Sequence, residues 1–537
     1  MAEVEEDSST KHAEAKEKNP LTKEFGTFVK ETMEKWKVPG ISLAVIDGEN
    51  VYAEGYGYAT LQGQISATAQ TLWYCASTTK AHTAAALSEI IHSKSEPLLS
   101  KGWSTTIASI IPEDFVLQDE WATKHVTLDD AVGHRTGMTD QFNSTAREEN
   151  GVRVTPKAVT RNLRNLPMVL EPRSTFHYCN FMYVVLSHIL ETVSGKSLEK
   201  VLKEHIWDPL DMKSTFLNLD EAKKADDHLA DGYYWDKQNG EYRWVDFLEV
   251  EEISGAGGAF STVLDYAKWV KCLLFETEPF SSEVHKDIKK SRSIVTTAPG
   301  GGIEVSLYSL GWQRTLYKGH LLYLHSGGMH AYGSQVYWLP DKKFGVVAFG
   351  NTAYTSNAVE DILAYQLMGD KLGIPQADRF DFDSSWEKRI DFATGQIEDP
   401  IKHAFPSCPE TNIASTFKTS ELIGSYSDPG YGTITLREES HPGKLEEMVL
   451  VADRPEMTYK YQLRLHHAFA DYWAVAITTP WNPTLLNQCF PGEFKRGRDG
   501  RVAALEIEWV GHMGPLSEGT TTFSRVADEE AMKESYV

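Results

Sequence analysis

Residues 72–93 read LWYCASTTKAHTAAALSEIIHS, in which a polar Ser-Thr-Thr-Lys turn separates a short apolar run from an alanine-rich segment. The composition of residues 77–93 predicts a buried helix that begins at Ser77. Lys80 lies one helical turn along the same face and can reach the Ser77 hydroxyl. A serine is a good nucleophile near neutral pH only when a neighbouring base takes its proton. The stretch therefore predicts an activated serine at a helix N-terminus, where free backbone N–H groups favour negative charge.

The S-x-x-K spacing is weak evidence when it stands alone. Besides Ser77/Lys80 it recurs in the chain, for example at Ser8/Lys11, Ser197/Lys200 and Ser415/Lys418. A solvated Ser and Lys on a helix surface is the ordinary explanation for any one copy. Only the copy at Ser77 opens a long apolar helix and follows an apolar turn that can bury it, so we take Ser77 and Lys80 as catalytic candidates.

A second candidate motif is Tyr178-Cys179-Asn180, which precedes a predicted helix. Of the 23 tyrosines, only Tyr178 is followed two places later by Asn. A positive charge on Lys80 would favour the phenolate, so we expect a lowered phenol pKa and a shared proton. Asn180 could hold Lys80 and a substrate carbonyl through its amide. The alternative is a core Tyr followed by an Asn that caps the helix.

The third candidate motif is His325-Ser326-Gly327-Gly328, at the end of an apolar strand. An edge strand that ends in two glycines leaves room for a substrate next to the backbone. A free N–H there, together with the N–H of Ser77, would form an oxyanion hole. H-x-G also occurs at His441 and His512, and a strand His is more often an ordinary core or surface residue.

The pattern outside these motifs predicts an α+β fold. Residues 21–37 have helical spacing, and residues 41–47 and 51–57 read as a hairpin. Further helices are predicted at 127–133, 181–194, 197–205 and 261–275, and strands near 320–326, 332–339 and 344–349. We expect an antiparallel sheet that contains both ends of this domain, flanked by helices, with the helical middle as a subdomain.

The sequence changes in character after Gly373. Residues 375–412 are rich in Pro, Asp and Ser with little periodicity, which indicates a linker. From about Leu422, short β-rich runs with regular turns predict a small antiparallel β-barrel. We expect a disordered tail (1–20), the α+β domain (21–373), a linker (374–412) and the barrel domain (413–537).

Composition narrows the classes of partner. The formal net charge of −23 over 537 residues would repel phosphate backbones, so we expect no nucleic acid partner. There is no apolar run of about 18 residues and no secretory signal pattern at the N-terminus, so we expect no membrane partner and a cytoplasmic location. Five scattered cysteines lack metal-ligand spacing, and no motif indicates a metal or a cofactor. Cys75 and Cys179 are expected to be small buried apolar residues rather than a disulfide.

The three motifs, in this order, resemble those of the serine β-lactamase and penicillin-binding-protein superfamily, and in particular its class C-related branch. The resemblance covers roughly residues 22–370. Flanking stretches also resemble that branch: Val38-Pro-Gly-Ile-Ser-Leu-Ala-Val45, Gly55-Tyr-Gly-Tyr-Ala59, Thr127-Leu-Asp-Asp-Ala131, His134-Arg-Thr-Gly-Met138, Gly255-Ala-Gly-Gly258 and Gly311-Trp312. The branch includes esterases, D-aminopeptidases and fungal acyltransferases.

The resemblance implies a role for each motif residue. Ser77 would be the acylated nucleophile, with Lys80 and Tyr178 as the proton-transfer pair. Substrate binding would fall to Asn180, His325, Ser326, Gly327 and Gly328, with the amides of Ser77 and Gly328 as the oxyanion hole. His325 stands where β-lactamases have the Lys of K-T-G. A neutral imidazole binds a substrate carboxylate less well than an ammonium, which disfavours penicillin-like acids.

These observations predict a serine hydrolase that forms an acyl-enzyme on Ser77 and cleaves a small ester or amide, an ester being favoured. One alternative is an acyltransferase that passes the acyl group to an alcohol or amine. Another is a binding or scaffold protein without turnover. Gly424-Ser-Tyr-Ser-Asp-Pro-Gly-Tyr-Gly432 and Phe523-Ser-Arg525 resemble a lipocalin-like domain appended to some relatives. In those relatives the domain covers the active-site mouth or mediates assembly, so oligomerisation stays open.

Overall fold

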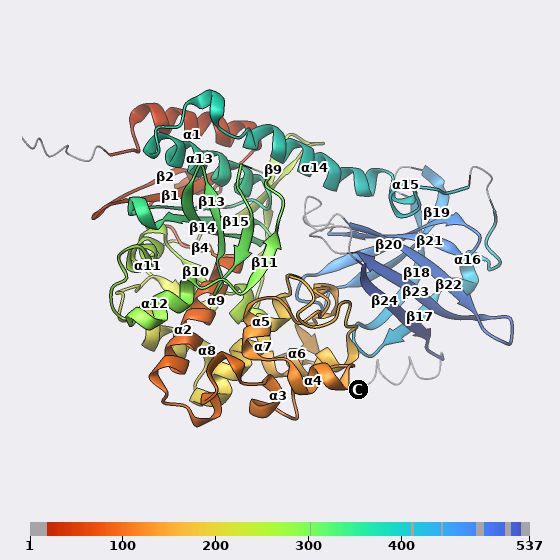
Figure 1. Cartoon of the computed structure of the whole chain (residues 1–537). Helices are drawn as coiled ribbons and strands as arrows, with labels where there is room; N and C mark the ends of the chain where they lie inside the picture. The colour runs from red at the N-terminus through yellow and green to blue at the C-terminus, as the bar shows by residue number, and fades with distance from the viewer. Residues whose placement is uncertain are drawn as a thin grey trace, which may run out of the picture.

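A computed structural model of the chain describes residues 19–300, 302–409, 413–441, 444–479, 488–510 and 517–527. Residues 1–18 of the predicted disordered tail lie outside the described residues. Figure 1 shows a domain built around a large sheet, with a barrel beside it and helices running between the two. We call these parts the sheet domain and the barrel.

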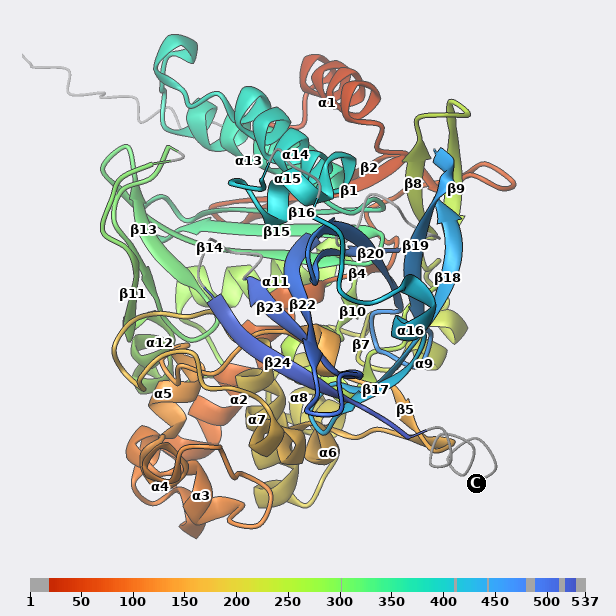
Figure 2. The ribbon, with the colours of Figure 1, turned by 90° about the vertical axis from the view of Figure 1, so that its right-hand side faces the viewer.

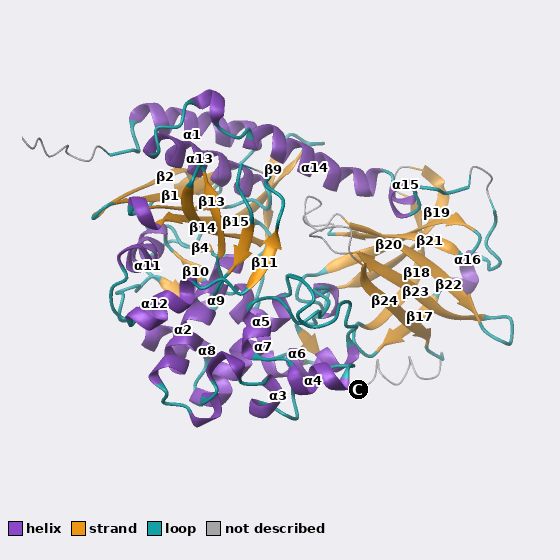
Figure 3. Cartoon of the chain, viewed as in Figure 1, coloured by secondary structure: helices purple, strands orange, loops and turns teal. Residues whose placement is uncertain are grey.

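The sheet domain contains a nine-stranded antiparallel sheet, whose strands Figure 3 shows in orange. In spatial order the strands are β11 (Ser293–Thr296), β12 (Ser306–Tyr308), β13 (Gln313–Tyr317), β14 (His320–Met329), β15 (Tyr332–Leu339), β16 (Phe344–Gly350), β1 (Gly40–Asp47), β2 (Asn50–Thr60) and β3 (Ile65–Ser66). β1 pairs with β16 over its length, with Asp47 opposite Phe344. The prediction that both ends of the domain join one sheet is therefore confirmed.

Strand β1 shows why helices cover both faces of the sheet. Successive side chains of a strand point to opposite faces. Ile41, Leu43 and Val45 pack in one apolar cluster with α1 (Lys23–Trp36) and α13 (Thr355–Lys371). Ala44 and Ile46 pack in the other cluster, on the face that carries the remaining helices. Because all eight residues of β1 are buried, the strand reads as an almost continuous apolar run.

The second face holds α2 (Thr79–Ser93), α11 (Val263–Phe275) and the predicted helical subdomain. The helices of the subdomain are α3 (Ile107–Ile110), α4 (Glu120–His125), α5 (Leu128–Val132), α6 (Pro156–Asn162), α7 (Asn180–Ser194) and α8 (Leu198–Leu202). Shorter elements around them are α9 (Leu219–Lys224), α10 (Ser254–Gly257), α12 (Ser282–Lys289), and strands β4 (Trp73–Tyr74), β5 (Glu148–Glu149), β6 (Val152–Arg153), β7 (Thr215–Phe216), β8 (Gly232–Asp236), β9 (Glu241–Val245) and β10 (Phe260–Ser261).

Strand β14 differs from its prediction in length and position. It continues through Gly327 and Gly328 to Met329, and it is an inner strand between β13 and β15. It is therefore not an edge strand of the sheet. Its pairing with β13 stops at Leu324, whereas its pairing with β15 continues to Met329. Residues 325–329 therefore lack a β13 partner on one side, because β13 begins at Gln313, opposite Leu324.

The segment predicted as a linker contains two helices, α14 (Phe382–Glu398) and α15 (Pro400–Ala404). The Asp381 side chain caps α14 by accepting from Ser384 N–H at 3.0 Å. The Trp386 indole N–H donates to Asp361 of α13 at 2.9 Å, which holds α14 on the sheet domain. The contact of Trp386 joins residues 25 positions apart, so local periodicity did not reveal the helix.

The predicted barrel is closed and has eight antiparallel strands (Figure 2). After α16 (Thr419–Leu422), its strands are β17 (Gly424–Asp428), β18 (Gly432–His441), β19 (Lys444–Arg454), β20 (Tyr461–Phe469), β21 (Tyr472–Thr478), β22 (Gln488–Arg496), β23 (Val502–Val510) and β24 (Ser517–Arg525). β24 pairs with β17 and closes the barrel. Stacked rings such as Tyr431 and Trp509, 5.2 Å apart, lie in its core.

Gly327 and Gly328 allow a direct test of how β14 packs. A Cβ at Gly327 would lie 2.2 Å from Ser334 Oγ and 2.6 Å from Cys75 O, whereas one at Gly328 would meet no atom within 4 Å. Overpacking of this kind costs about 1–3 kcal/mol. Gly327→Ala should therefore lower the thermal unfolding midpoint by several degrees, while the Gly328→Ala control leaves it unchanged. Equal midpoints, measured by circular dichroism, would contradict the close packing of β14 on Cys75.

Candidate active site

Ser77 lies in a tight turn between β4 and α2 that several hydrogen bonds hold. Cys75 N–H donates to Ala259 O at 2.8 Å, and the Thr79 hydroxyl donates to Ala76 O at 2.7 Å. Ala76 has a φ of +46°, a conformation that non-glycine residues adopt at a cost. Ala76 and Thr78 are buried, whereas Ser77 is partly exposed. The turn therefore presents the Ser77 hydroxyl to solvent from a fixed backbone.

Lys80 is fully buried, and its amine contacts the Ser77 hydroxyl. Lys80 Nζ donates to Ser77 Oγ at 3.1 Å, to Asn180 Oδ1 and to Ala256 O at 2.7 Å. Burial lowers the pKa of Lys80 to about 7, although the nearby Asp140 carboxylate acts in the opposite direction. The amine is therefore neutral in a substantial fraction of molecules near pH 7, and a neutral amine can accept the serine proton.

Asn180 is the first residue of α7, and Asp140 fixes its side chain. Asp140 Oδ1 accepts from Asn180 N–H at 2.6 Å, and Oδ2 accepts from the Asn180 side-chain amide at 3.0 Å. Because the amide nitrogen faces Asp140, the amide oxygen faces Lys80. Burial raises the pKa of Asp140. The predicted contact between Asn180 and Lys80 is present, and Asp140 was not among the predicted site residues.

Tyr178 lies beside Lys80, but its pKa shifts opposite to the prediction. Burial raises the pKa of the Tyr178 phenol well above its ordinary value, and an interaction with the Ser77 hydroxyl only partly opposes this. Lys80 Nζ lies 5.0 Å from the ring centroid, against the face of the ring. His134 stacks on Tyr178 with centroids 4.4 Å apart. The phenol therefore stays protonated near neutral pH, so the expected lowered pKa is wrong.

His325 is a neutral, buried imidazole that the protein itself binds through both nitrogens. Its Nδ1 lies 2.7 Å from Ser326 O, which can only accept, so Nδ1 carries the proton. Nε2 then accepts from the Tyr308 hydroxyl at 3.0 Å. Burial, together with the nearby Lys80, lowers the pKa of His325 to about 3. The imidazole is therefore uncharged, as we expected for a His at this position.

The end of β14 passes directly beside the Ser77 turn. A Cβ at Gly327 would lie 3.0 Å from Ala76 Cβ, so the strand and the turn are in contact. Asn357 of α13 donates to Gly327 O at 2.9 Å and anchors the strand from behind. Ser326 and Gly328 are exposed where β14 has no β13 partner. The structure thus brings all three predicted motifs together around Ser77.

The buried groups that sequence reasoning missed lie one layer behind the motif residues. Asp140 holds Asn180, Tyr308 binds His325, and His134 stacks on Tyr178. His134 opens one of the stretches that resembled the family, and Asp140 comes two residues after that stretch ends. Tyr308 carries no spacing signal, because it reaches the site only through strand pairing.

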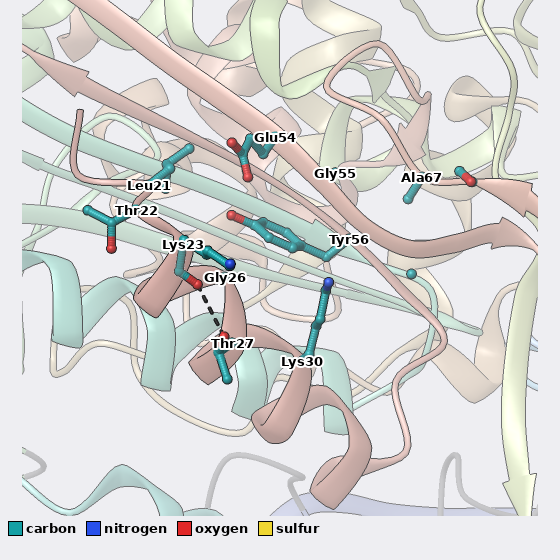
Figure 4. A pocket seen from close by; sticks show the side chains of 12 residues that line it. Leu21, Thr22, Lys23, Gly26, Thr27, Lys30, Glu54, Gly55, Tyr56 and Ala67 are labelled. Carbon is teal, nitrogen blue, oxygen red and sulfur yellow. Dashed lines mark hydrogen bonds between the residues drawn. The ribbon is translucent and has the colours of Figure 1, made fainter.

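Two cysteines adjoin the site, and one surface cavity lies away from it. Cys75 and Cys179 are buried free thiols. Among the described residues, no three His, Cys, Asp or Glu side chains converge so as to hold a metal ion. Within the same ranges, no helix is both long and apolar enough to cross a membrane. A surface cavity of about 620 Å³ lies between α1 and β2, lined by Lys30 and Tyr56 among others, and contains no motif residue (Figure 4).

Comparison with known proteins shows to which family the chain belongs. The family model described as Beta-lactamase matches residues 25–368. Unguisins hydrolase ungD' of Aspergillus campestris is 32% identical over 95% of this chain and 94% of its own length. A D-aminopeptidase of Brucella anthropi is 24% identical over 69% of this chain and 67% of its own length. The octameric penicillin-binding protein homologue from Pyrococcus abyssi shares the fold, with a TM-score of 0.58 and 22% identity over 93% of this chain and 99% of its own. The chain belongs to the beta-lactamase family.

Proposed function

We propose that the chain is a serine hydrolase that forms an acyl-enzyme on Ser77. The observation that carries this proposal is the 3.1 Å contact between Lys80 Nζ and Ser77 Oγ, made by a fully buried amine whose pKa burial lowers to about 7. A base is most effective when its pKa lies near the working pH. The match to hydrolases over nearly the whole chain supports the same conclusion.

The proposed reaction uses each motif residue at a named atom. Neutral Lys80 takes the proton from Ser77 Oγ, which attacks the substrate carbonyl carbon. The resulting oxyanion accepts from the backbone N–H groups of Ser77 and Gly328. The acyl–nitrogen or acyl–oxygen bond breaks, and the leaving atom takes a proton from the Tyr178 phenol. Tyr178 then regains a proton from the Lys80 ammonium. Lys80 next takes a proton from water, whose oxygen attacks the acyl carbon. The bond between the acyl carbon and Ser77 Oγ then breaks, Oγ takes the proton back from the Lys80 ammonium, and the acid leaves.

The proposed substrate is a small amide or ester that carries no essential carboxylate next to His325. A carboxylate clamp needs a cation, and the imidazole of His325 is neutral with both nitrogens occupied. This argues against penicillin-like acids as substrates. The name of the D-aminopeptidase indicates cleavage of an amide bond in that relative, which makes amides the first class to assay here.

An acyltransferase would use the same acyl-enzyme with an alcohol or amine as the acceptor. We propose water as the acceptor, because the relatives that match over most of the chain are named hydrolases. Adding a candidate alcohol to the assay distinguishes the two activities. Formation of a new ester in place of the free acid would overturn hydrolysis as the main reaction.

A fluorophosphonate should label wild-type protein once, and Ser77→Ala should not be labelled at all. The reagent reacts only with a serine that a neighbouring base activates. Intact-protein mass measures the adduct. Ser197→Ala is the matched control, because Ser197 also precedes a lysine by three residues but only caps α8. Absence of an adduct on folded wild-type protein, or an adduct that persists in Ser77→Ala, would contradict the proposed nucleophile and favour a scaffold without turnover.

The pH dependence of kcat/KM should follow the protonation of Lys80. Lys80 must be neutral to take the serine proton, and its pKa is about 7. As pH falls below about 7, kcat/KM should therefore drop by about tenfold per pH unit. Initial rates between pH 5 and 9, with circular dichroism to confirm folding at each pH, check this expectation. A profile that stays flat down to pH 5 would exclude Lys80 as the base.

A further inference from the structure

Glu518 of the barrel lies behind the active site and contacts two residues of the sheet domain. It is the second residue of β24, and only 3% of it is exposed. Glu518 Oε2 accepts from Asp140 N–H at 3.0 Å. The His177 ring nitrogen Nε2 lies 3.1 Å from Glu518 Oε1. A carboxylate buried to this extent needs such partners. Both partners come from the other domain.

Each of these two contacts leads to one half of the proposed proton relay. Asp140 holds the Asn180 amide, which accepts from Lys80. His177 directly precedes Tyr178. The backbone N–H of His177 donates to the backbone carbonyl of His134, whose ring stacks on Tyr178. Although burial lowers the pKa of His177, the hydrogen bond and the charge of Glu518, together with the charge of Asp140, outweigh burial and raise that pKa. One carboxylate therefore binds both the backbone of Asp140, which leads to Lys80, and the ring of His177, which precedes Tyr178.

The barrel holds the loop that carries Asp140 at further points. The Gln141 amide donates to Val510 O at 3.3 Å, and the Tyr461 hydroxyl donates to Asn143 O at 3.2 Å. Thr458 N–H donates to Thr145 O at 2.9 Å. Residues 140–145 therefore lie against the barrel over their length. The position of Asp140 depends on the barrel as well as on the sheet domain.

We propose that Glu518 is a positioning residue of the active site, through which the barrel sets the geometry of the Lys80–Tyr178 relay. The proposal rests on the proposed function, because it assigns a role relative to Ser77 acylation. Glu518 touches no substrate in this account; it acts by holding Asp140 and His177. The length of its side chain, which spans the gap between the domains, is therefore more important than its charge.

Two substitutions separate length from charge. Glu518→Gln keeps the length and an oxygen that accepts from Asp140 N–H, but it loses the charge. Glu518→Asp keeps the charge and is one methylene shorter, so it cannot reach both partners. The measurement is the rate of fluorophosphonate acylation of Ser77 by intact-protein mass, resolved into maximal rate and reagent affinity. Displacement of catalytic groups by about 1 Å can cost about 100-fold in rate.

We expect Glu518→Asp to lower the maximal acylation rate about tenfold or more with unchanged reagent affinity. Glu518→Gln should stay within about threefold of wild type. Affinity should not change because Glu518 contacts neither β14 nor Ser77. The reverse order, with Gln slow and Asp fast, would overturn positioning by length. Wild-type rates in both variants would overturn any role in the site.

Asn162→Ala is the matched control for docking of the barrel. The Asn162 side chain donates to Gly430 O of the barrel at 2.9 Å and to Ser144 O at 3.4 Å, so its removal weakens docking without removing a contact of Asp140 or His177. It should acylate at the wild-type rate. If Asn162→Ala is as slow as Glu518→Asp, the effect comes from general domain docking and the proposal fails. If wild-type protein is not labelled at all, the proposed function fails instead, so the two failures are distinguishable.

Discussion

The removal of the Lys80 amine from water is the constraint on which the rest of the site depends. An ammonium in bulk water holds its proton at pH 7 and cannot serve as a base. Burial lowers the pKa of the amine because it penalises the charged form, and the acceptors of Ser77, Asn180 and Ala256 hold the buried nitrogen in place. These residues come from three separate parts of the chain. The sheet domain must therefore fold around Lys80 before the amine acquires the pKa that the chemistry needs.

The groups next to Ser77 are themselves held by buried polar partners. Asp140 orients Asn180, Tyr308 fixes the tautomer of His325, and Asn357 anchors the carbonyl of Gly327. Such buried networks are costly when one member is missing, and they fix geometry when complete. Because these partners fix the side chains around it, the Ser77 turn contacts β14 and two helices in one fixed arrangement. It also ties the rigidity of the site to residues that touch no substrate.

Local patterns in the sequence predicted the fold class, the barrel and the three motifs, because strand alternation, helical spacing and turn residues are local. The network behind the motifs could not be predicted in the same way. Tyr308 reaches His325 through strand pairing, and Glu518 reaches Asp140 from another domain. The pKa of Tyr178 was predicted in the wrong direction, because the sequence showed the neighbouring cation but not the burial that outweighs it. Helix α14 was missed because contacts with α13 hold it in place.

The pairing of β1 with β16 also has a consequence for biosynthesis. The paired residues are about 300 positions apart, so β1 leaves the ribosome long before its partner exists. At about 5–20 residues per second, the delay is roughly 15–60 s. During this interval β1 can pair only with β2, and the backbone N–H and C=O groups of its other edge stay unpaired. An open strand edge is a template for pairing with other chains, so the growing polypeptide carries an aggregation-prone edge until residue 350 has been made.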